Sequence, residues 1–105
     1  MGKILLEAPV YTVEAALLAN EYGVDRIELC ADIGEGGTTP GAGMLSYLKK
    51  LIQIPVFAMV RPRGGDFVYT PEEIEVMKYE IRLLKSCGAD GFVFGVLDEH
   101  GKVNQ

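Results

Sequence analysis

Short apolar runs alternate along this chain with longer stretches whose apolar residues recur every three or four positions. Runs of this kind are typical of buried β-strands, and the longer spacing is typical of amphipathic helices. The predicted strands cover residues 4–10, 25–30, 55–60 and 91–97. The predicted helices cover residues 13–22, a segment around 45–52, and the stretch between Thr70 and Gly88. The order of elements is therefore βαβαβαβ.

Two of the predicted helices carry specific signals at their ends. Thr12 precedes the first helix and Gly23 follows it, as expected for an N-cap and a C-terminal stop. Thr70 precedes the third helix, with Pro71 at its first position and Glu73 placed to complete a capping box. These signals support the assignment of helices between the strands.

Alternating strands and helices predict an α/β fold in which helices cover a parallel sheet. Two segments, YGVDRIELC from Tyr22 and CGADGFVFG from Cys87, repeat the order helix end, glycine, aspartate and strand. Their offset is 87 − 22 = 65 residues, or two βα units of about 32 residues, a spacing typical of TIM-like (βα) barrels. A doubly wound sheet is the alternative, because this turn recurs in other α/β proteins. We expect residues 1–105 to form one domain, a half barrel of four parallel strands that corresponds to the N-terminal half of a (βα)8 barrel.

A half barrel leaves its first and fourth strands with one unpaired edge each. Unpaired edges tend to recruit further strands, because their backbone N–H and C=O groups have no partners. We therefore expect a homo-oligomer that forms through the exposed edges of the half barrel.

Charged side chains fall on the inner face of the predicted strands. Because side chains alternate between the two faces of a strand, Glu7, Glu28 and Arg61 should point toward the barrel axis. Buried charges need partners, so we expect Arg61 to pair with Glu28 or with Glu7. The cluster is then either a structural ion pair or the floor of a polar pocket for a carboxylate, a phosphate or a metal. These three residues are the candidates for catalysis, since (βα) barrels have their sites at the C-terminal ends of the strands.

Two glycine-rich loops follow the second and third strands and should meet at the mouth of the barrel. Glycine allows a backbone to approach a ligand closely, and the planar guanidinium of Arg63 can bind an oxyanion. The candidate ligand-binding residues are Glu35, Gly36, Gly37, Thr39, Arg61, Arg63, Gly65 and Asp66. Neither loop matches a nucleotide-binding motif. The alternative explanation of the glycines is that they only allow the chain to turn and bind no ligand. The expected ligand is a small anion, either a carboxylate or a phosphate.

The composition narrows the class of protein. The chain has 105 residues, of which 49% are hydrophobic and 24% charged, and its net charge is −5, as in many folded globular domains. This charge argues against nucleic acid as a partner, because phosphate binding needs a clustered basic face. No apolar run approaches the roughly 20 residues that cross a membrane, and the first residues do not resemble a signal peptide. We therefore expect a cytoplasmic protein with neither a nucleic-acid nor a membrane partner.

The chain has two cysteines, Cys30 and Cys87. Cys30 ends the second strand at the mouth, whereas Cys87 ends the third helix at the opposite end, so we expect no disulfide between them. Cys30 and the inward-facing Met59 on the next strand offer two soft ligands for Cu(I). A small buried residue is the alternative role for a lone cysteine.

Four stretches of the sequence together resemble the CutC family of copper homeostasis proteins: DRIELC, EGGTTPG, IPVFAMVRPRGGDFVY and GADGFVFGVL. The resemblance runs from Leu6 to about Val103 and implies the N-terminal half of a TIM-like barrel of roughly twice this length. It also implies a cytoplasmic role in copper tolerance or trafficking, with Cu(I) binding proposed for some members. Cys30, within a Glu-Leu-Cys motif, is then the implied copper ligand.

The residues themselves leave two other functions open. In a barrel enzyme or binding protein for a small anionic ligand, Glu7 or Glu28 would act as acid or base, and Arg61 and Arg63 would orient the ligand. A non-catalytic oligomeric scaffold is the third reading. The fold alone does not choose among these functions, because barrels support many chemistries.

Overall fold

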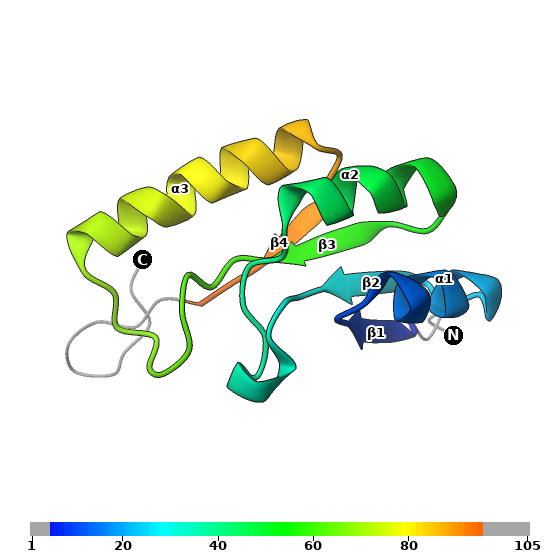
Figure 1. The fold of residues 1–105 in the computed structure, drawn as a ribbon, viewed down its shortest axis with the longest axis horizontal. Coiled ribbons are helices and arrows are strands. Elements are labelled where there is room, and N and C mark those ends of the chain that lie inside the picture. Colours follow the sequence, from blue (N-terminus) through cyan, green and yellow to red (C-terminus); the bar gives the residue numbers. More distant parts are fainter. Residues whose placement is uncertain (1–4, 96–105) are drawn as a thin grey trace.

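The computed structural model describes residues 5–95 and shows four β-strands that alternate with three α-helices (Figure 1). The strands are β1 (Glu7–Val10), β2 (Arg26–Leu29), β3 (Val56–Met59) and β4 (Gly91–Val93). The helices are α1 (Val13–Glu21), α2 (Ala42–Leu51) and α3 (Pro71–Ser86), and a short 3-10 helix, η1 (Ile33–Glu35), follows β2. The predicted alternation of strands and helices is confirmed.

The four strands form one parallel sheet in the order β1-β2-β3-β4. The register pairs Glu7 with Arg26, Glu28 with Phe57, and Phe57 with Gly91. Strands that follow one another in the chain therefore lie side by side, as they do in a (βα) barrel. A doubly wound sheet would instead reverse its strand order within the sheet.

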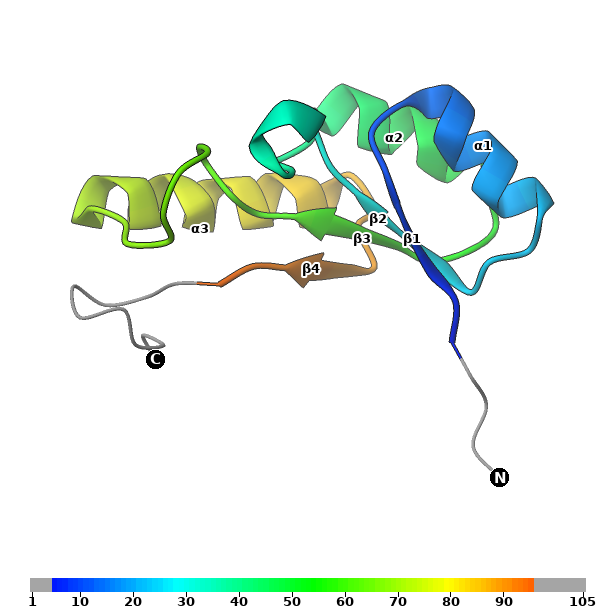
Figure 2. The same ribbon diagram turned by 90° about the horizontal axis from the view of Figure 1, so that it is seen from below.

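The three α-helices cover one face of the sheet and leave the other face uncovered (Figure 2). On the covered face, Ile27, Leu29 and Ala58 have 0% exposure. They belong to one apolar cluster with Leu48 of α2 and Leu84 of α3. The core therefore lies between the sheet and the helices, and the uncovered face is the inner face of the half barrel.

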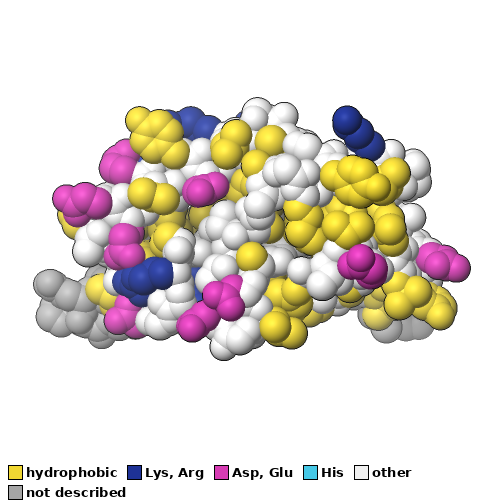
Figure 3. Space-filling model, viewed as in Figure 1, with side chains coloured by type: hydrophobic (Ala, Val, Ile, Leu, Met, Phe, Trp, Pro, Cys, Tyr) yellow, Lys and Arg dark blue, Asp and Glu magenta, His cyan; other side chains and the backbone are white. Residues whose placement is uncertain are grey.

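The outer surface of the helix layer keeps several large apolar side chains exposed (Figure 3). They include Leu18 on α1, Tyr47 and Leu51 on α2 and Tyr79 on α3, each at least 44% exposed. Within residues 5–95, none of the helices combines the length and the apolar character needed to span a membrane.

Side-chain caps define the starts of α1 and α3. Thr12 Oγ1 accepts a hydrogen bond from the Ala15 N–H at 3.1 Å. At α3, Thr70 Oγ1 accepts from the Glu73 N–H at 3.1 Å, and Glu73 Oε1 accepts from the Thr70 N–H at 2.9 Å. The predicted capping box is confirmed. Gly23 follows α1 with a φ of +75°, which is the left-handed conformation expected of a glycine at a helix end.

The two outer strands are shorter than predicted. β1 begins at Glu7 rather than at residue 4, and β4 ends at Val93 rather than at residue 97. Residues 1–4 and 96–105 lie outside the described residues, whereas residues 5–6 and 94–95 are described and are not strand. Each outer strand has a neighbour on one side only, so fewer backbone hydrogen bonds hold its ends.

Candidate functional site

Arg61 connects the two loops that meet beyond the C-terminal ends of β2 and β3. Its side chain is mostly buried, with the residue 8% exposed. Its Nη1 donates to the carbonyl oxygens of Glu35 and of Gly37, the latter at 3.1 Å. Its Nη2 donates to the carbonyl oxygen of Gly65 at 2.8 Å. One guanidinium therefore fixes the backbone of the first loop to that of the second.

Thr39 strengthens the same junction through the backbone of Arg61. The Thr39 N–H donates to the Arg61 carbonyl oxygen at 3.0 Å, and Thr39 Oγ1 accepts from the Arg61 N–H at 2.9 Å. The Arg61 guanidinium also lies over the ring of Phe67, 4.8 Å from its centroid. Both the backbone and the side chain of Arg61 thus hold the mouth together.

The glycines of the mouth shape the two loops. Gly36, Gly37 and Gly65 have φ values of +79°, +105° and +88°, a region that glycine adopts without steric cost. Glu35 packs against Gly64, where an added methyl group would lie 1.8 Å from Glu35 Oε2. Gly64 was not predicted, because the sequence does not reveal which glycine faces the other loop. Turn formation explains these positions, and ligand binding by them stays a prediction.

The expected ion pair between Arg61 and Glu28 or Glu7 is wrong. Glu7 pairs instead with Arg26, its partner in the β1–β2 register. Arg26 also lies over the ring of Phe57, 4.3 Å from its centroid. The alternation of side chains predicts correctly which face of the sheet a residue lies on. It does not predict how far along the strand direction that residue lies from residues of neighbouring strands. Glu28 lies level with Phe57, and Arg61 follows Phe57 by 61 − 57 = 4 residues, about 13 Å along a strand.

Glu7 and Glu28 are neighbouring carboxyl groups on the inner face. The hydrogen bond from Arg26 lowers the pKa of Glu7. Burial, followed by the proximity of Glu7, raises the pKa of Glu28. Two carboxyl groups whose pKa values move apart suit acid and base roles. Their catalytic role stays a prediction, and so does that of Arg61, which lies at the mouth rather than beside them.

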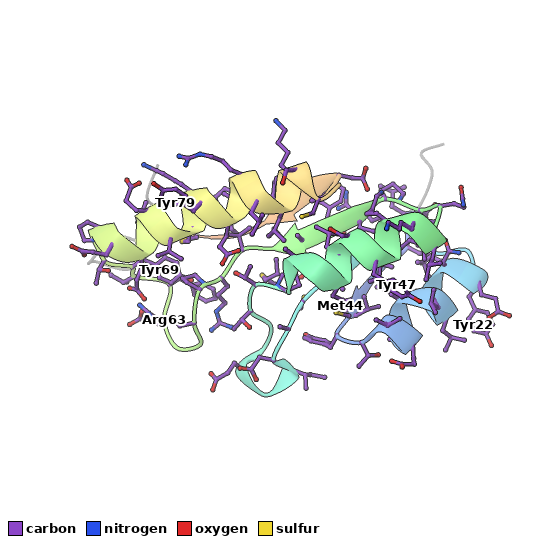
Figure 4. The ribbon with its side chains drawn as sticks, turned by 45° about the horizontal axis from the view of Figure 1, so that its top comes forward. Tyr22, Met44, Tyr47, Arg63, Tyr69 and Tyr79 are labelled. Carbon is purple, nitrogen blue, oxygen red and sulfur yellow. The ribbon has the colours of Figure 1, made fainter. Side chains whose placement is uncertain are left out.

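Arg63 binds the start of α3 from the loop after β3 (Figure 4). Its Nε and Nη2 donate to the two carboxylate oxygens of Glu73 at 2.6 and 3.2 Å. Its remaining N–H groups reach the carbonyl oxygens of Val68 at 2.8 Å and of Asp66 at 3.1 Å, and it lies 5.0 Å from the ring centroid of Tyr69. The hydrogen bond from Arg63 lowers the pKa of Glu73. Arg63 and Asp66 therefore organise their own loop, and anion binding by them stays a prediction.

Cys30 and Met59 both border Gly37. Cys30 is 1% exposed. A methyl group at Gly37 would lie 3.5 Å from Cys30 Sγ and 3.6 Å from Met59 Cε. Burial, followed by the charge of Glu28, whose Oε1 lies 3.8 Å from Cys30 Sγ, raises the pKa of the thiol to about 11. The structure thus brings both predicted copper ligands to one place, with the thiol protonated at neutral pH.

Within residues 5–95, no group of three or more His, Cys, Asp and Glu side chains is arranged to hold a metal ion. Cys87 is the C-cap of α3, and both cysteines are free. A metal ion at Cys30 would therefore depend on soft sulfur donors.

Two buried polar atoms at the mouth, Arg61 Nε and Tyr69 Oη, have no hydrogen-bond partner among the described residues. Burial raises the pKa of Tyr69, while the nearby Arg61 acts in the opposite direction. An unpaired buried donor costs about 1–3 kcal/mol, so an acceptor placed here would bind favourably. Tyr69 was not predicted as a site residue, and its position soon after the arginine loop is the only sequence signal for it.

A hollow of about 420 Å³ lies between the start of α2 and one side of α3. Thr39, Pro40 and Arg61 belong to one wall, and Val76, Glu80 and Leu83 belong to the other. The α3 wall is apolar apart from the carboxylate of Glu80. The hollow therefore places the cationic Arg61 opposite a wall that is mainly apolar and carries one carboxylate.

The parallel strands, the helices on one face and the polar groups beyond the strand ends define half of a TIM-like (βα) barrel. The sequence matches the CutC family over residues 4–105. The chain belongs to the CutC family.

Similar proteins extend well beyond the length of this chain. The copper homeostasis protein cutC homologs of Homo sapiens and Mus musculus are 56% and 54% identical over 101 residues, which cover 96% of this chain and 37% of each homolog. The family protein CutC of Erwinia tasmaniensis is 49% identical over 95% of this chain and 40% of its own length. The crystal structure of the putative copper homeostasis protein CutC from Streptococcus agalactiae superposes with a TM-score of 0.88 at 28% identity, over 96% of this chain and 50% of that chain. The chain thus spans about two fifths of these curated relatives.

Proposed function

We propose that this chain serves copper homeostasis and that its cargo, Cu(I), binds between Cys30 and Met59. The observation that supports the proposal is that both sulfur-containing side chains border Gly37, at the carboxyl end of the sheet. Thiolate and thioether are the ligand types that Cu(I) prefers. Membership of a family whose relatives carry copper homeostasis names adds to this support.

The surroundings of Cys30 determine how the cargo would bind. Because the pKa of the thiol is about 11, Cu(I) must displace a proton, and its affinity should fall as the pH falls. Harder cations are disfavoured, since within residues 5–95 no group of three or more His, Cys, Asp and Glu side chains is arranged to hold one. We expect Cu(I), rather than Zn²⁺ or Cu²⁺, to be retained.

Titration of the reduced protein with Cu(I) against a competing chelator tests this function. Wild type should bind one Cu(I) per chain, Cys30→Ser should lose that binding, and Met59→Leu should weaken it. Cys87→Ser is the matched control and should bind as wild type does, because Cys87 lies at the far end of α3. Equal binding by Cys30→Ser and wild type, or no binding by wild type, would contradict the proposal.

A second candidate function is the binding of a small anion, a carboxylate or a phosphate, at the mouth. The observation that favours it is the pair of unpaired buried donors, Arg61 Nε and Tyr69 Oη. An acceptor oxygen beside either atom would satisfy it. In an enzyme, Glu7 and Glu28 would supply acid and base on the inner face, away from Arg61, and that role rests on their opposite pKa shifts.

Thermal unfolding with added phosphate or acetate, against chloride at equal ionic strength, tests the second candidate. At ten times its Kd, a bound anion should stabilise the wild type by about 1.4 kcal/mol. Tyr69→Phe should lose this effect while Tyr79→Phe, altered at a 67% exposed ring on α3, should keep it. Failure of both anions to stabilise the wild type would remove this candidate.

The place of the protein in the cell is also part of the proposal. Copper handling by a cytoplasmic protein agrees with the sequence-based expectation. Fractionation of the native cells with an antibody to the chain would locate it directly.

A further inference from the structure

The hollow beside α3 is bounded by α2 and α3, two neighbouring helices of the chain that lie side by side (Figure 1). Its volume of about 420 Å³ is within the range of the sites that hold small organic ligands in proteins. The described residues that line it do not include Cys30, Met59 or Tyr69. The hollow is therefore a different place from the proposed copper site and from the surroundings of Tyr69.

Small residues at the start of α2 leave this space open. Gly41 and Ala42 line the hollow, and an added methyl group at Gly41 would meet no atom within 4 Å. Gly41 has a φ of −69° and a ψ of 138°, which are backbone angles that other residues adopt as well. The backbone therefore does not require glycine at this position, and the effect of glycine here is to leave room.

One side of α3 presents apolar side chains and a carboxylate to the hollow. Val76, Glu80 and Leu83 all line it, and their spacings of four and three residues place them on one face of the helix. Val76 and Leu83 are each 49% exposed. Because burial of apolar surface is favourable, this wall favours a ligand with an apolar body.

Glu80 is the charged side chain of this lining that has no partner. It is partly buried, and it makes no hydrogen bond or ion pair with the described residues. The guanidinium of Arg61, on the opposite wall, already donates to three main-chain carbonyl oxygens of the mouth. A carboxylate binds a charged donor more strongly than a neutral one. The free carboxylate of Glu80 therefore favours a ligand with a cationic group.

We propose that the hollow binds a small primary amine, with its ammonium group against Glu80 and its apolar body against Val76 and Leu83. A carboxylate ligand would place a like charge beside Glu80, which is unfavourable. A neutral apolar ligand would cover Val76 and Leu83 but would leave Glu80 without a partner. The amine is the class of ligand that matches both features of the α3 wall.

An NMR titration of the isotope-labelled protein with benzylamine tests this site. Benzylamine joins an ammonium group, protonated at neutral pH, to an apolar ring. The amide signals of Gly41, Val76 and Leu83 should shift, whereas that of Leu18 on α1 should not. Benzyl alcohol has nearly the same shape without the charge and should bind the wild type about tenfold more weakly. Benzoate should bind more weakly still.

Two variants separate the roles of the charge and of the apolar wall. Glu80→Gln should weaken the binding of benzylamine about tenfold and leave the Kd of benzyl alcohol unchanged. Leu83→Ala should weaken the binding of both compounds, because it removes apolar contact area. The matched controls are Glu75→Gln, at a 60% exposed carboxylate that pairs with Lys78, and Tyr79→Ala, at a 67% exposed ring. Neither residue lines the hollow, so both controls should bind as wild type does.

Several results would overturn the proposal. One is the absence of a saturable shift of the three signals with benzylamine, and another is equal affinity of the wild type for benzylamine and benzyl alcohol or benzoate. Equal affinity of Glu80→Gln and wild type for benzylamine, or an equal loss in Glu75→Gln, would also contradict it. The result does not depend on Cu(I) binding, which the Cys30→Ser titration tests separately.

Discussion

Asp90 shows how a single side chain at the residue scale joins three elements. Its Oδ2 accepts hydrogen bonds from Lys49 Nζ at 2.6 Å and from the Val56 N–H at 2.8 Å. It therefore links α2 and the start of β3 to the residue just before β4. Burial alone would raise the pKa of Asp90, but the two donors outweigh burial and lower it.

The lowered pKa of Asp90 predicts a pH-dependent contribution to stability. A carboxyl group with a lower pKa in the folded chain stabilises it above the unfolded pKa, and this contribution is lost as pH falls through the folded value. The side chain is 40% exposed, so screening by solvent limits the effect of the charge to about 0.5–1 kcal/mol. Asp90→Asn should thus lower the free energy of unfolding near neutral pH and hardly change it near pH 2. Urea unfolding of both proteins at several pH values measures this, and a pH-independent difference would rule out the charge as its source.

At the scale of elements, the start of α3 anchors the loop that precedes it. Glu73 closes the capping box with Thr70 and also binds the guanidinium of Arg63. The first turn of the helix is thereby tied to the loop that contains Arg63 and Tyr69. The stability of this helix end and the shape of the mouth therefore depend on the same carboxylate.

Removal of the Thr70 cap should destabilise the chain without altering its fold. Thr70→Ala leaves the Glu73 N–H without its acceptor and should lower the free energy of unfolding by about 1 kcal/mol. Thr70→Ser retains the hydroxyl and is the matched control, expected within about 0.5 kcal/mol of wild type. Urea unfolding followed by circular dichroism measures both variants. A loss as large in Thr70→Ser as in Thr70→Ala would show that the methyl group, and not the cap, carries the effect.

At the scale of the whole molecule, the sequence predicts the order of elements and the faces of the strands. Both follow from local periodicity, because a side chain's face depends only on its place within its own strand. The buried Ile27 and Ala58 and the uncovered Glu28 show this in the structure.

Local periodicity does not predict contacts that depend on the register between neighbouring strands or on the path of a loop. The pairing of Glu7 with Arg26 follows from the β1–β2 register, which alternation does not determine. The hydrogen bonds of Arg61 to Glu35 and Gly65 depend on how two loops fold toward each other. The edges of the sheet were predicted too long, because strand length there depends on neighbours as well as on apolar residues.

The way in which Arg61 holds the mouth has a consequence for the evolution of the family. The guanidinium binds main-chain carbonyl groups of residues 35, 37 and 65, and every amino acid supplies such a group. The side chains of residues 35, 37 and 65 make none of these bonds, so they can change without loss of the anchor, except where a positive φ demands glycine. A fixed arginine beneath variable loops would allow related proteins to acquire new ligands at the mouth without rebuilding the barrel.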